Sequence, residues 1–220
     1  MDDPDMGRWS YAYDAVDNLT RQTDARGVTT TFTYDALNRL TRKHYTLPAG
    51  RDIPDPGPVT YTYDDPAKPF SKGKLTAITD GSGSSSFAYD AFGRLVTEAK
   101  TIDGTPYTIS RTYDLLGRLT SLTYPDGEVA TSTYNPQGGL ETVTGTPPTG
   151  GVSPYVTDIS YNAAGQVTRI AYGNWTVSDY TYHPQTLRLD RLLTTGPAGL
   201  LQDFSYAFDA VGNVRFPTGS

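Results

Sequence analysis

The sequence predicts an all-β fold: an array of stacked antiparallel β-hairpins that forms a curved strip, an open segment of a spiral. Three observations predict it. A Tyr-Asp-Ala-Phe-Gly-Arg-Leu segment at residues 89–95 recurs almost unchanged at 113–119 and 34–40. Aromatic and small residues alternate before each Asp, with the period of two that is typical of strands. Turn-forming residues (22 Gly and 16 Pro) are abundant, and no segment shows a sustained helical period.

Each part of the heptapeptide has a local role. The residues up to the Tyr form a strand, and Asp is favoured at the first position of a type I turn, where its carboxylate accepts bonds from backbone N–H groups. The Gly three residues later tolerates the positive φ that a type I turn with a bulge requires. Asn38 replaces that Gly in one repeat, because Asn enters the left-handed region at low cost. Arg-Leu then begins the return strand.

About nine degenerate repeats follow one another, with spacings of roughly 21 to 29 residues, a period typical of repeat architectures. We expect the array to span residues 9–216, between a lead-in at 1–8 and a tail at 217–220. The repeat-defining structural residues are Tyr13, Asp14, Tyr34, Asp35, Asn38, Arg39, Tyr63, Asp64, Tyr89, Asp90, Gly93, Arg94, Tyr113, Asp114, Gly117, Arg118, Tyr134, Gly138, Tyr161, Gly165, Tyr182, Phe208, Asp209 and Gly212.

The connections follow in chain order. Residues 24–27 form the first turn at the opposite end of the hairpins, and later ones lie at 103–104, 126–127, 172–175 and 196–199. Four prolines exclude residues 46–58 from a central strand, so we expect a surface loop there and a second one at 145–154. The segments 65–73 and 183–186 are insertions within turns. Residues 79–86 are rich in Gly and Ser but lack the Lys and the following helix of a phosphate-binding loop.

The pattern Tyr-Asp-x-x-Gly-Arg-Leu resembles the YD repeat, also called the RHS repeat, and the resemblance extends from about residue 9 to 214. The family includes Rhs polymorphic toxins, the shell-forming B and C components of Tc toxins, and teneurins. The resemblance implies a strip of hairpins that spirals into a hollow shell, which in the toxin members encloses a C-terminal toxic domain. Those members also carry an aspartate autoprotease core after the repeats. This sequence has no match to that core, so neither protease nor toxin activity is transferred to it.

The composition limits the classes of function that the chain can have. Hydrophobic residues make up only 36 %, which suits a thin sheet with a polar face, and the 17 Tyr can bury a ring while the hydroxyl stays wet. A net charge of −6 argues against nucleic-acid binding, and no apolar run approaches the roughly 20 residues of a membrane span. The N-terminus lacks the features of a signal peptide. We interpret the chain as a piece of a longer parent protein that is secreted or displayed at the cell surface, with Met1 and Gly219–Ser220 as additions.

Nothing in the sequence marks a catalytic site, a cofactor or a metal site. Only His44 and His183 could act as bases at neutral pH; we expect His183 in a turn and His44 facing solvent. The recurring carboxylates of Asp14, Asp35, Asp64, Asp90, Asp114 and Asp209 could form a ladder of calcium ligands, but capping of their own turns accounts for every one. The absence of Cys and of clustered His argues against a zinc site.

The aromatic residues that alternate along the strands are compatible with two functions. In the first, the Tyr and Phe rings stack between adjacent hairpins, and the chain is a non-catalytic structural segment of a shell that encapsulates or displays an effector. In the alternative, exposed aromatic rows bind carbohydrate or a cell surface, with Trp9 and Trp175 as glycan contacts. The expected partners are flanking repeats and the encapsulated C-terminal domain. Unpaired edges near residues 9–13 and 207–216 also predict edge-to-edge self-association.

Overall fold

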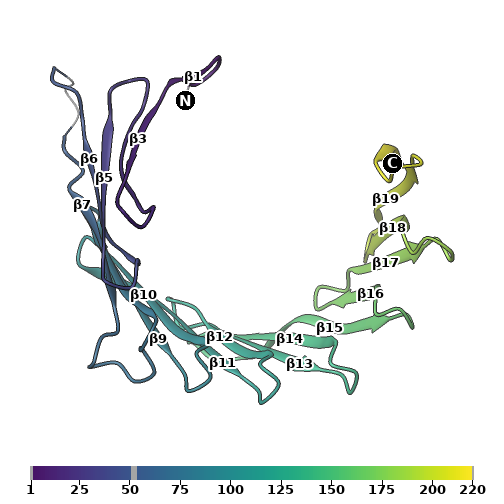
Figure 1. Cartoon of the computed structure of the whole chain (residues 1–220). Coiled ribbons are helices and arrows are strands. Elements are labelled where there is room, and N and C mark those ends of the chain that lie inside the picture. Colours follow the sequence, from purple (N-terminus) through teal and green to yellow (C-terminus); the bar gives the residue numbers. More distant parts are fainter. Residues whose placement is uncertain (1, 51–53, 220) are drawn as a thin grey trace. The chain divides into compact units, whose positions relative to one another are not determined.

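The computed structural model describes residues 2–50 and 54–219, and Figure 1 shows the course of its strands. The chain divides into two compact units, Met1–Ser110 and Arg111–Ser220, which are described separately below. The described residues form strands, turns and loops without a helix, as the sequence predicts. No helix in this part of the chain is therefore long or apolar enough to cross a membrane.

The first unit is an antiparallel sheet whose strands pair in chain order from β3 to β11. The strands are β3 (Ser10–Tyr13), β4 (Leu19–Thr23), β5 (Thr29–Tyr34), β6 (Leu40–Thr46), β7 (Pro58–Tyr63), β8 (Leu75–Asp80), β9 (Gly83–Tyr89), β10 (Leu95–Ile102) and β11 (Thr105–Tyr113), the last of which contributes residues to both units. Before them, the residues expected as a lead-in form a small hairpin of their own, β1 (Asp2–Asp3) with β2 (Gly7–Arg8).

The second unit has the same construction, with pairing in chain order from β12 to β20. Its strands are β12 (Leu119–Thr123), β13 (Val129–Tyr134), β14 (Leu140–Thr146), β15 (Ser153–Tyr161), β16 (Val167–Tyr172), β17 (Val177–Tyr182), β18 (Leu189–Gly196), β19 (Gly199–Phe208) and β20 (Val214–Gly219). β20 continues past residue 216, where we expected the array to end; Ser220, the last residue of the expected tail, lies outside the described residues, as does Met1.

A bulge recurs where each hairpin closes. In the first hairpin Ala12 pairs with Arg21 but Tyr13 pairs with Leu19, so the return strand carries one extra residue. Equivalent register shifts occur in most of the later hairpins. Such a bulge is the expected companion of a type I turn that ends in a residue with positive φ. It sets the Tyr opposite the first aliphatic residue of the return strand.

The sheet has almost no apolar interior. Ile159 is the buried hydrophobic residue among those described, and several small polar side chains are buried instead, such as Thr30, Thr76 and the hydrogen-bonded pair Ser178 and Thr194. This agrees with the low hydrophobic content of the sequence. The stability of each unit must therefore come from the backbone ladders and from contacts that each repeat makes with the next.

The loops are slightly shorter than predicted. The first long loop runs from 47 to 57, because Thr46 and Pro58 belong to strands; Arg51, Asp52 and Ile53 within it lie outside the described residues. The second runs from 147 to 152, between β14 and β15. Pro58 is tolerated as the first residue of β7, where a missing N–H costs little.

Candidate functional site

The turn that starts at the Asp of each repeat, called here the front turn, is built by that residue. In the second repeat the carboxylate of Asp35 accepts hydrogen bonds from the N–H groups of Leu37 (2.9 Å) and Arg39 (3.0 Å). The carbonyl of Asp35 accepts a bond from the N–H of Asn38, which closes the turn. Asp90 and Asp114 make the same set of bonds in their own repeats. The Asp therefore caps its own turn.

The fourth residue of the turn has the positive φ that the sequence predicts. Asn38 has a φ of 59°, against 76° at Gly93 and 81° at Gly117. The same conformation recurs at Gly138, Gly165 and Gly212. In the turn at residues 172–175 it falls on Trp175, with a φ of 66°, which is unusual for a bulky residue.

The Arg of the heptapeptide, called here the motif arginine, joins one repeat to the next. The Nε atom of Arg118 donates to the carboxylate of Asp114 at 2.6 Å, and its guanidinium lies 4.5 Å from the ring centre of Tyr134 in the following repeat. Arg39 lies in the same way over Tyr63, at 4.4 Å. The further pairs of this kind are Lys74 over Tyr89 and Arg188 over Phe208. Each pair is a cation–π contact between neighbouring repeats.

The Tyr of the heptapeptide, called here the motif tyrosine, makes the second bond between repeats. Its hydroxyl donates to the carbonyl of the first return-strand residue in the preceding repeat, at 2.7–3.0 Å. The bonds run from Tyr34 to Leu19, Tyr63 to Leu40, Tyr89 to Leu75, Tyr134 to Leu119, Tyr161 to Leu140 and Tyr182 to Val167. The hydroxyl continues the hydrogen bonding where the backbone ladder between the two strands has stopped.

These contacts correct one expectation. We expected the aromatic rings to stack on their counterparts in adjacent hairpins. In the described part of the chain the stacked pair is Trp9 with Tyr11, whose ring centres are 6.3 Å apart. Among the motif tyrosines, Tyr63, Tyr89 and Tyr134 have a cation over the ring, and the hydroxyl bonds to a carbonyl of the preceding repeat. The motif tyrosines therefore contact the neighbouring repeat through backbone carbonyls, and some also through a cation, rather than through ring stacking.

The electrostatics of the front turn favour charged carboxylates. The N–H of Arg39 donates to Asp35 and, against a smaller opposing effect of burial, lowers the pKa of that carboxyl, with the guanidinium adding to it. The side chain of Arg39 also lowers the pKa of Asp64, to which it donates at 2.6 Å. The carboxylate of Asp35 is thus occupied within its own turn, and that of Asp64 accepts from Arg39 of the preceding repeat and from the N–H of Gly73. No group of three or more metal-binding side chains occurs among the described residues.

The first, eighth and last repeats replace one residue of the ion pair in the front turn. In the first and last repeats Asn18 and Asn213 replace the motif arginine and donate to Asp14 and Asp209. In the eighth repeat His183 replaces the Asp, and its Nδ1 atom accepts from backbone N–H groups of the turn, as the carboxylate does elsewhere. His183 therefore lies in a turn, as predicted.

His44 is not fully solvent-facing, contrary to our expectation. Its Nε2 atom lies 3.4 Å from a carboxylate oxygen of Asp55 in the first long loop, and its side chain is only 24 % exposed.

The two Trp residues are far apart in the sequence and differ in their surroundings. Trp9 is half-buried against Tyr11 and donates to the carbonyl of Met6, whereas Trp175 is 82 % exposed at the tip of its turn. They belong to different units and are not brought together within either one.

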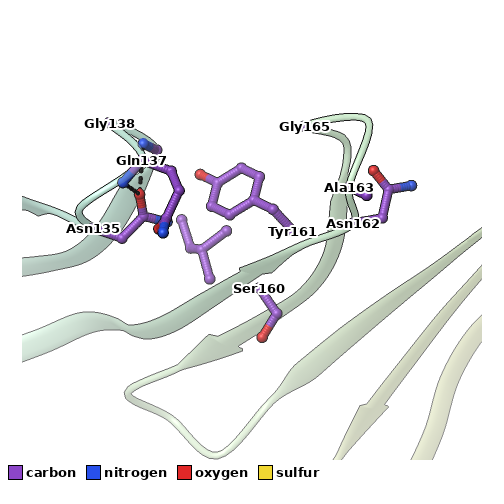
Figure 2. Close-up of a pocket in the computed structure, with 10 residues that line it drawn as sticks. Asn135, Gln137, Gly138, Ser160, Tyr161, Asn162, Ala163 and Gly165 are labelled. Atoms are coloured by element: carbon purple, nitrogen blue, oxygen red, sulfur yellow. Dashed lines mark hydrogen bonds between the residues drawn. The ribbon is translucent and has the colours of Figure 1, made fainter.

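A cavity of about 630 Å³ lies where the sixth and seventh repeats meet. Its lining consists of Asn135, Gln137, Gly138, Gly139, Ile159, Ser160, Tyr161, Asn162, Ala163 and Gly165. Figure 2 shows the ring of Tyr161 between the turn of Asn135 and Gln137 and the turn of Asn162 and Gly165. None of the lining side chains carries a charge.

The cavity arises from a change in the motif. In the sixth repeat Asn135 stands in place of the Asp and Gly139 in place of the motif arginine. A Cβ atom on Gly139 would lie within about 3 Å of the Tyr161 ring. Arg118 of the fifth repeat covers the ring of Tyr134, whereas the sixth repeat has no side chain beyond hydrogen at the equivalent position. In the seventh repeat Asn162 and Gln166 replace the ion pair by an amide pair, with 3.0 Å between them.

Comparison with known families decides the identity of the repeat. The RHS Repeat family matches residues 13–52, 71–106 and 112–151, together more than half of the chain. This chain belongs to the RHS repeat family. The matched segments include the front turns that begin at Asp14, Asp35, Asp90, Asp114 and Asn135. No curated protein sequence matches the chain at a significant level.

Solved structures contain the same fold. The chain is 22 % identical to a chain of the TcdB2-TccC3 crystal structure, with a TM-score of 0.86 over 99 % of this chain and 12 % of that chain. A structure of the Photorhabdus luminescens Tc holotoxin pore gives 22 % identity and a TM-score of 0.84 over 99 % of this chain and 11 % of that chain. This RHS segment thus spans about an eighth of those chains. At this identity the likeness shows the fold alone.

One functional contact of the array was missed at the sequence level. The insertion at 65–73 carries Lys68, whose ammonium donates to the carbonyls of Thr76 (2.8 Å) and Phe87 (3.2 Å) and to the hydroxyl of Ser86 (2.7 Å). Lys68 thereby fastens the third RHS repeat to the fourth. The insertion contains two Lys residues, Lys68 and Lys72, and the sequence gives no signal that Lys68 makes these bonds.

Proposed function

We propose that the chain is a non-catalytic structural segment of an RHS β-shell, which in a longer parent protein encapsulates or displays an effector domain. The observation that carries the proposal is the periodic bond from each motif tyrosine to the carbonyl of the preceding repeat. Among the described residues such bonds join successive hairpins in both units, from Tyr34, Tyr63 and Tyr89 in the first and from Tyr134, Tyr161 and Tyr182 in the second.

The bonding of the charged side chains that recur at the repeat period supports the same role. A catalytic carboxylate or a calcium ligand needs free lone pairs directed at a common point. Here the carboxylate of Asp35 or Asp114 accepts from two backbone N–H groups and from the motif arginine of its own turn. The geometry thus favours a structural role over an enzymatic one. The exported character of the parent, with its flanking repeats and effector as partners, is part of this proposal.

Protease protection of the effector tests the proposal. In the parent protein the effector domain should resist a protease that degrades the same domain when it is produced alone. Three substitutions of motif tyrosines, Tyr34→Phe, Tyr89→Phe and Tyr134→Phe, should weaken the wall and increase the rate of cleavage. The matched control is Tyr107→Phe, since Tyr107 is exposed. Equal cleavage of the enclosed and the free effector would refute the proposal.

Self-association through the edges remains a prediction within this function. An isolated segment of a β-array presents unpaired N–H and C=O groups at its terminal strands, which can pair with another molecule. We expect the isolated chain to associate through residues near 9–13 and 207–216. Light scattering over a range of concentrations measures this, and a strictly monomeric chain at high concentration would contradict it.

A carbohydrate-binding or cell-surface-binding module is the second candidate function. One observation favours it: the indole of Trp175 is 82 % exposed although it is held in a defined turn. A glycan array with the purified chain tests this candidate. Binding that is lost in Trp175→Ala, and retained in a control with an exposed aliphatic residue changed, such as Leu187→Ala, would support it.

A further inference from the structure

The front turns of the first unit carry large apolar side chains at their tips. Val16, Leu37 and Phe92 stand two residues after the Asp of their repeats, and Phe70 lies in the insertion of the third repeat. All four are 56–73 % exposed. Antiparallel pairing in chain order puts these turns at the same end of the sheet, at steps of two strands or about 10 Å. This row of four side chains is called here the apolar rim.

The front turn does not require an apolar tip. It uses the backbone N–H of the tip residue, which donates to the carboxylate that begins the turn, as Leu37 does to Asp35 at 2.9 Å. In the second unit Gln137 and Ala164 occupy the same position, and their turns close through the same backbone bonds. The apolar side chains of the rim therefore need an explanation other than the stability of their own turns.

The turns at the opposite end of the same sheet are polar. The short ones, at residues 24–27, 80–83 and 102–105, have Arg26, Ser82 and Asp103 at their exposed tips. The apolar tips are thus gathered at one end of the unit. A contiguous set of exposed apolar side chains is typical of a surface that contacts another molecule.

Two charged side chains flank the rim without a partner of their own. Asp17 follows Val16 in the first repeat, and Lys72 lies two residues after Phe70 in the third. Both are exposed, and neither side chain forms a hydrogen bond or an ion pair among the described residues. They have opposite charges and lie one repeat to either side of Leu37. A row with an acid at one end and a base at the other is complementary to itself after a rotation of 180°.

We propose that the apolar rim binds a second copy of this chain, in a dimer whose twofold axis passes through Leu37. The axis sets Leu37 against the partner's Leu37. Val16 then meets the partner's Phe70, and Asp17 lies beside the partner's Lys72. The three contacts agree in register because the hairpins of both copies have the same spacing. Phe92 lies beyond these three turns, and its ring is contacted within its own turn by Arg94, at 4.9 Å from the ring centre.

The area of this contact fits a weak dimer. Burial of one Val, Leu or Phe side chain removes about 60–120 Å² of apolar surface from water. Three such side chains from each copy therefore bury about 400–700 Å², which is small for a specific interface. We accordingly expect the dimer to form at high protein concentration and to dissociate on dilution.

A lipid surface is the competing occupant of the rim, because a row of apolar tips can also enter a membrane. Asp17, however, stands next to Val16 at the tip of its turn. On insertion into lipid its carboxylate would lose water without gaining an ion pair, which is costly. In the dimer the same carboxylate gains Lys72 of the partner subunit. The charges at the rim therefore favour a second copy over a lipid surface.

Sedimentation equilibrium of the 220-residue chain over a range of concentrations tests the proposal. Leu37→Ser removes an apolar side chain from the axis in both copies and should raise the dissociation constant at least tenfold. Its melting temperature in dilute solution should be unchanged, because Leu37 is exposed. Ile102→Ser is the matched control, since Ile102 is an exposed aliphatic residue of the same unit at the opposite end of the sheet. We expect the control to dimerise within about twofold of the unchanged chain.

The charge pair tests the register of the two copies. Asp17→Asn and Lys72→Gln should each weaken the dimer by roughly three- to tenfold, because each removes two exposed ion pairs per dimer. The two changes together should weaken it no more than either alone, since they remove the same ion pairs. Asn is compatible with the φ of 64° at residue 17, as Asn38 has a φ of 59°.

A disulfide tests the position of the axis. The chain has no Cys, so Leu37→Cys introduces a single thiol. A residue on a twofold axis is brought close to its own copy, within the Cα separation of about 4.4–6.8 Å that a disulfide needs. Oxidation with copper–phenanthroline should therefore give a covalent dimer of Leu37→Cys, whereas Ile102→Cys should stay largely monomeric.

Three results would overturn the proposal. The first is a chain that stays monomeric at all concentrations. The second is a Leu37→Ser variant that associates as the unchanged chain does, which would assign the association to the terminal strands. The third is binding to phosphatidylcholine vesicles that Leu37→Ser abolishes, without any dimer in solution, which would assign the rim to lipid. The proposal does not depend on the shell function, since the protease-protection experiment and the dimerisation experiment can fail independently.

Discussion

The bond from the motif tyrosine to the preceding repeat can be tested by deleting one oxygen atom. In the fourth repeat the hydroxyl of Tyr89 donates to the carbonyl of Leu75 at 2.8 Å, and Lys74 lies 5.7 Å from the ring centre. The backbone ladder between β8 and β9 reaches Ala77 and Ser86 but no further toward Leu75. Tyr89→Phe keeps the ring and its cation and removes only the donor. The carbonyl of Leu75, which has no partner in the backbone ladder between β8 and β9, then loses the hydrogen bond from the Tyr89 hydroxyl.

The expected cost is about 1 kcal/mol, with a range of about 0.5–1.5 kcal/mol for one neutral hydrogen bond. For a chain of this length, 1 kcal/mol corresponds to roughly 2–4 °C in melting temperature. Far-UV circular dichroism during urea and thermal unfolding measures it. Tyr107→Phe is the matched control, because Tyr107 lies in the same unit, is 47 % exposed and has no described hydrogen bond from its hydroxyl. We expect the control to change stability by less than about 0.5 kcal/mol. Equal effects of the two substitutions would refute the role of the motif tyrosine.

Three further predictions follow from the turns and the insertion. Gly93→Val should destabilise by roughly 1–3 kcal/mol, because a β-branched residue is strained at a φ of 76°, whereas Gly93→Asn should be nearly neutral, as Asn38 already has this conformation; urea unfolding distinguishes the two. Lys68→Met should cost about 2 kcal/mol, because three acceptors lose a charged donor, and exposed Lys72→Met should cost almost nothing. The motif aspartates have a lowered pKa in the folded chain, so their contribution to stability is present above the unfolded value of 3.8 and is lost as the pH falls through the folded values. A melting temperature that stays constant on acidification below that value would contradict the last prediction.

The hairpins and their front turns could be predicted because the interactions that specify them are local. The Asp, the Gly three residues later and the alternation before them act within one heptapeptide, and each favours the same turn. Asn38 was predictable as a Gly substitute for the same reason. The conformation of Trp175 was not, because its positive φ is imposed by the bonds of its turn against the preference of the residue.

The contacts between repeats could not be derived from periodicity alone. The pair Arg118 and Tyr134 and the bond from Tyr134 to Leu119 join residues in neighbouring repeats, and their geometry depends on the bulge and on the strand register. An alternation of aromatic residues is equally compatible with ring stacking, which was our expectation. The partner of a ring is decided by which residue the register brings over it. The small hairpin at residues 2–8 was missed because its polar residues carry no alternation.

The cavity between the sixth and seventh repeats has a signal in the sequence. The sixth repeat is the one in which the Asp becomes Asn while the motif arginine becomes Gly. Each change alone resembles ordinary degeneration of a repeat. Only with the ring of Tyr161 in position does the double change become a cavity with available amides, since the sequence does not show what the missing arginine would have covered.

Electron cryomicroscopy of the parent protein tests the central claim most directly. The account predicts that residues 10–219 form part of a continuous wall of hairpins, with flanking RHS repeats paired to its terminal strands and an effector domain in the enclosed volume. A map in which this segment projects as a separate arm, with its terminal strands unpaired and no domain enclosed by the wall, would contradict the account.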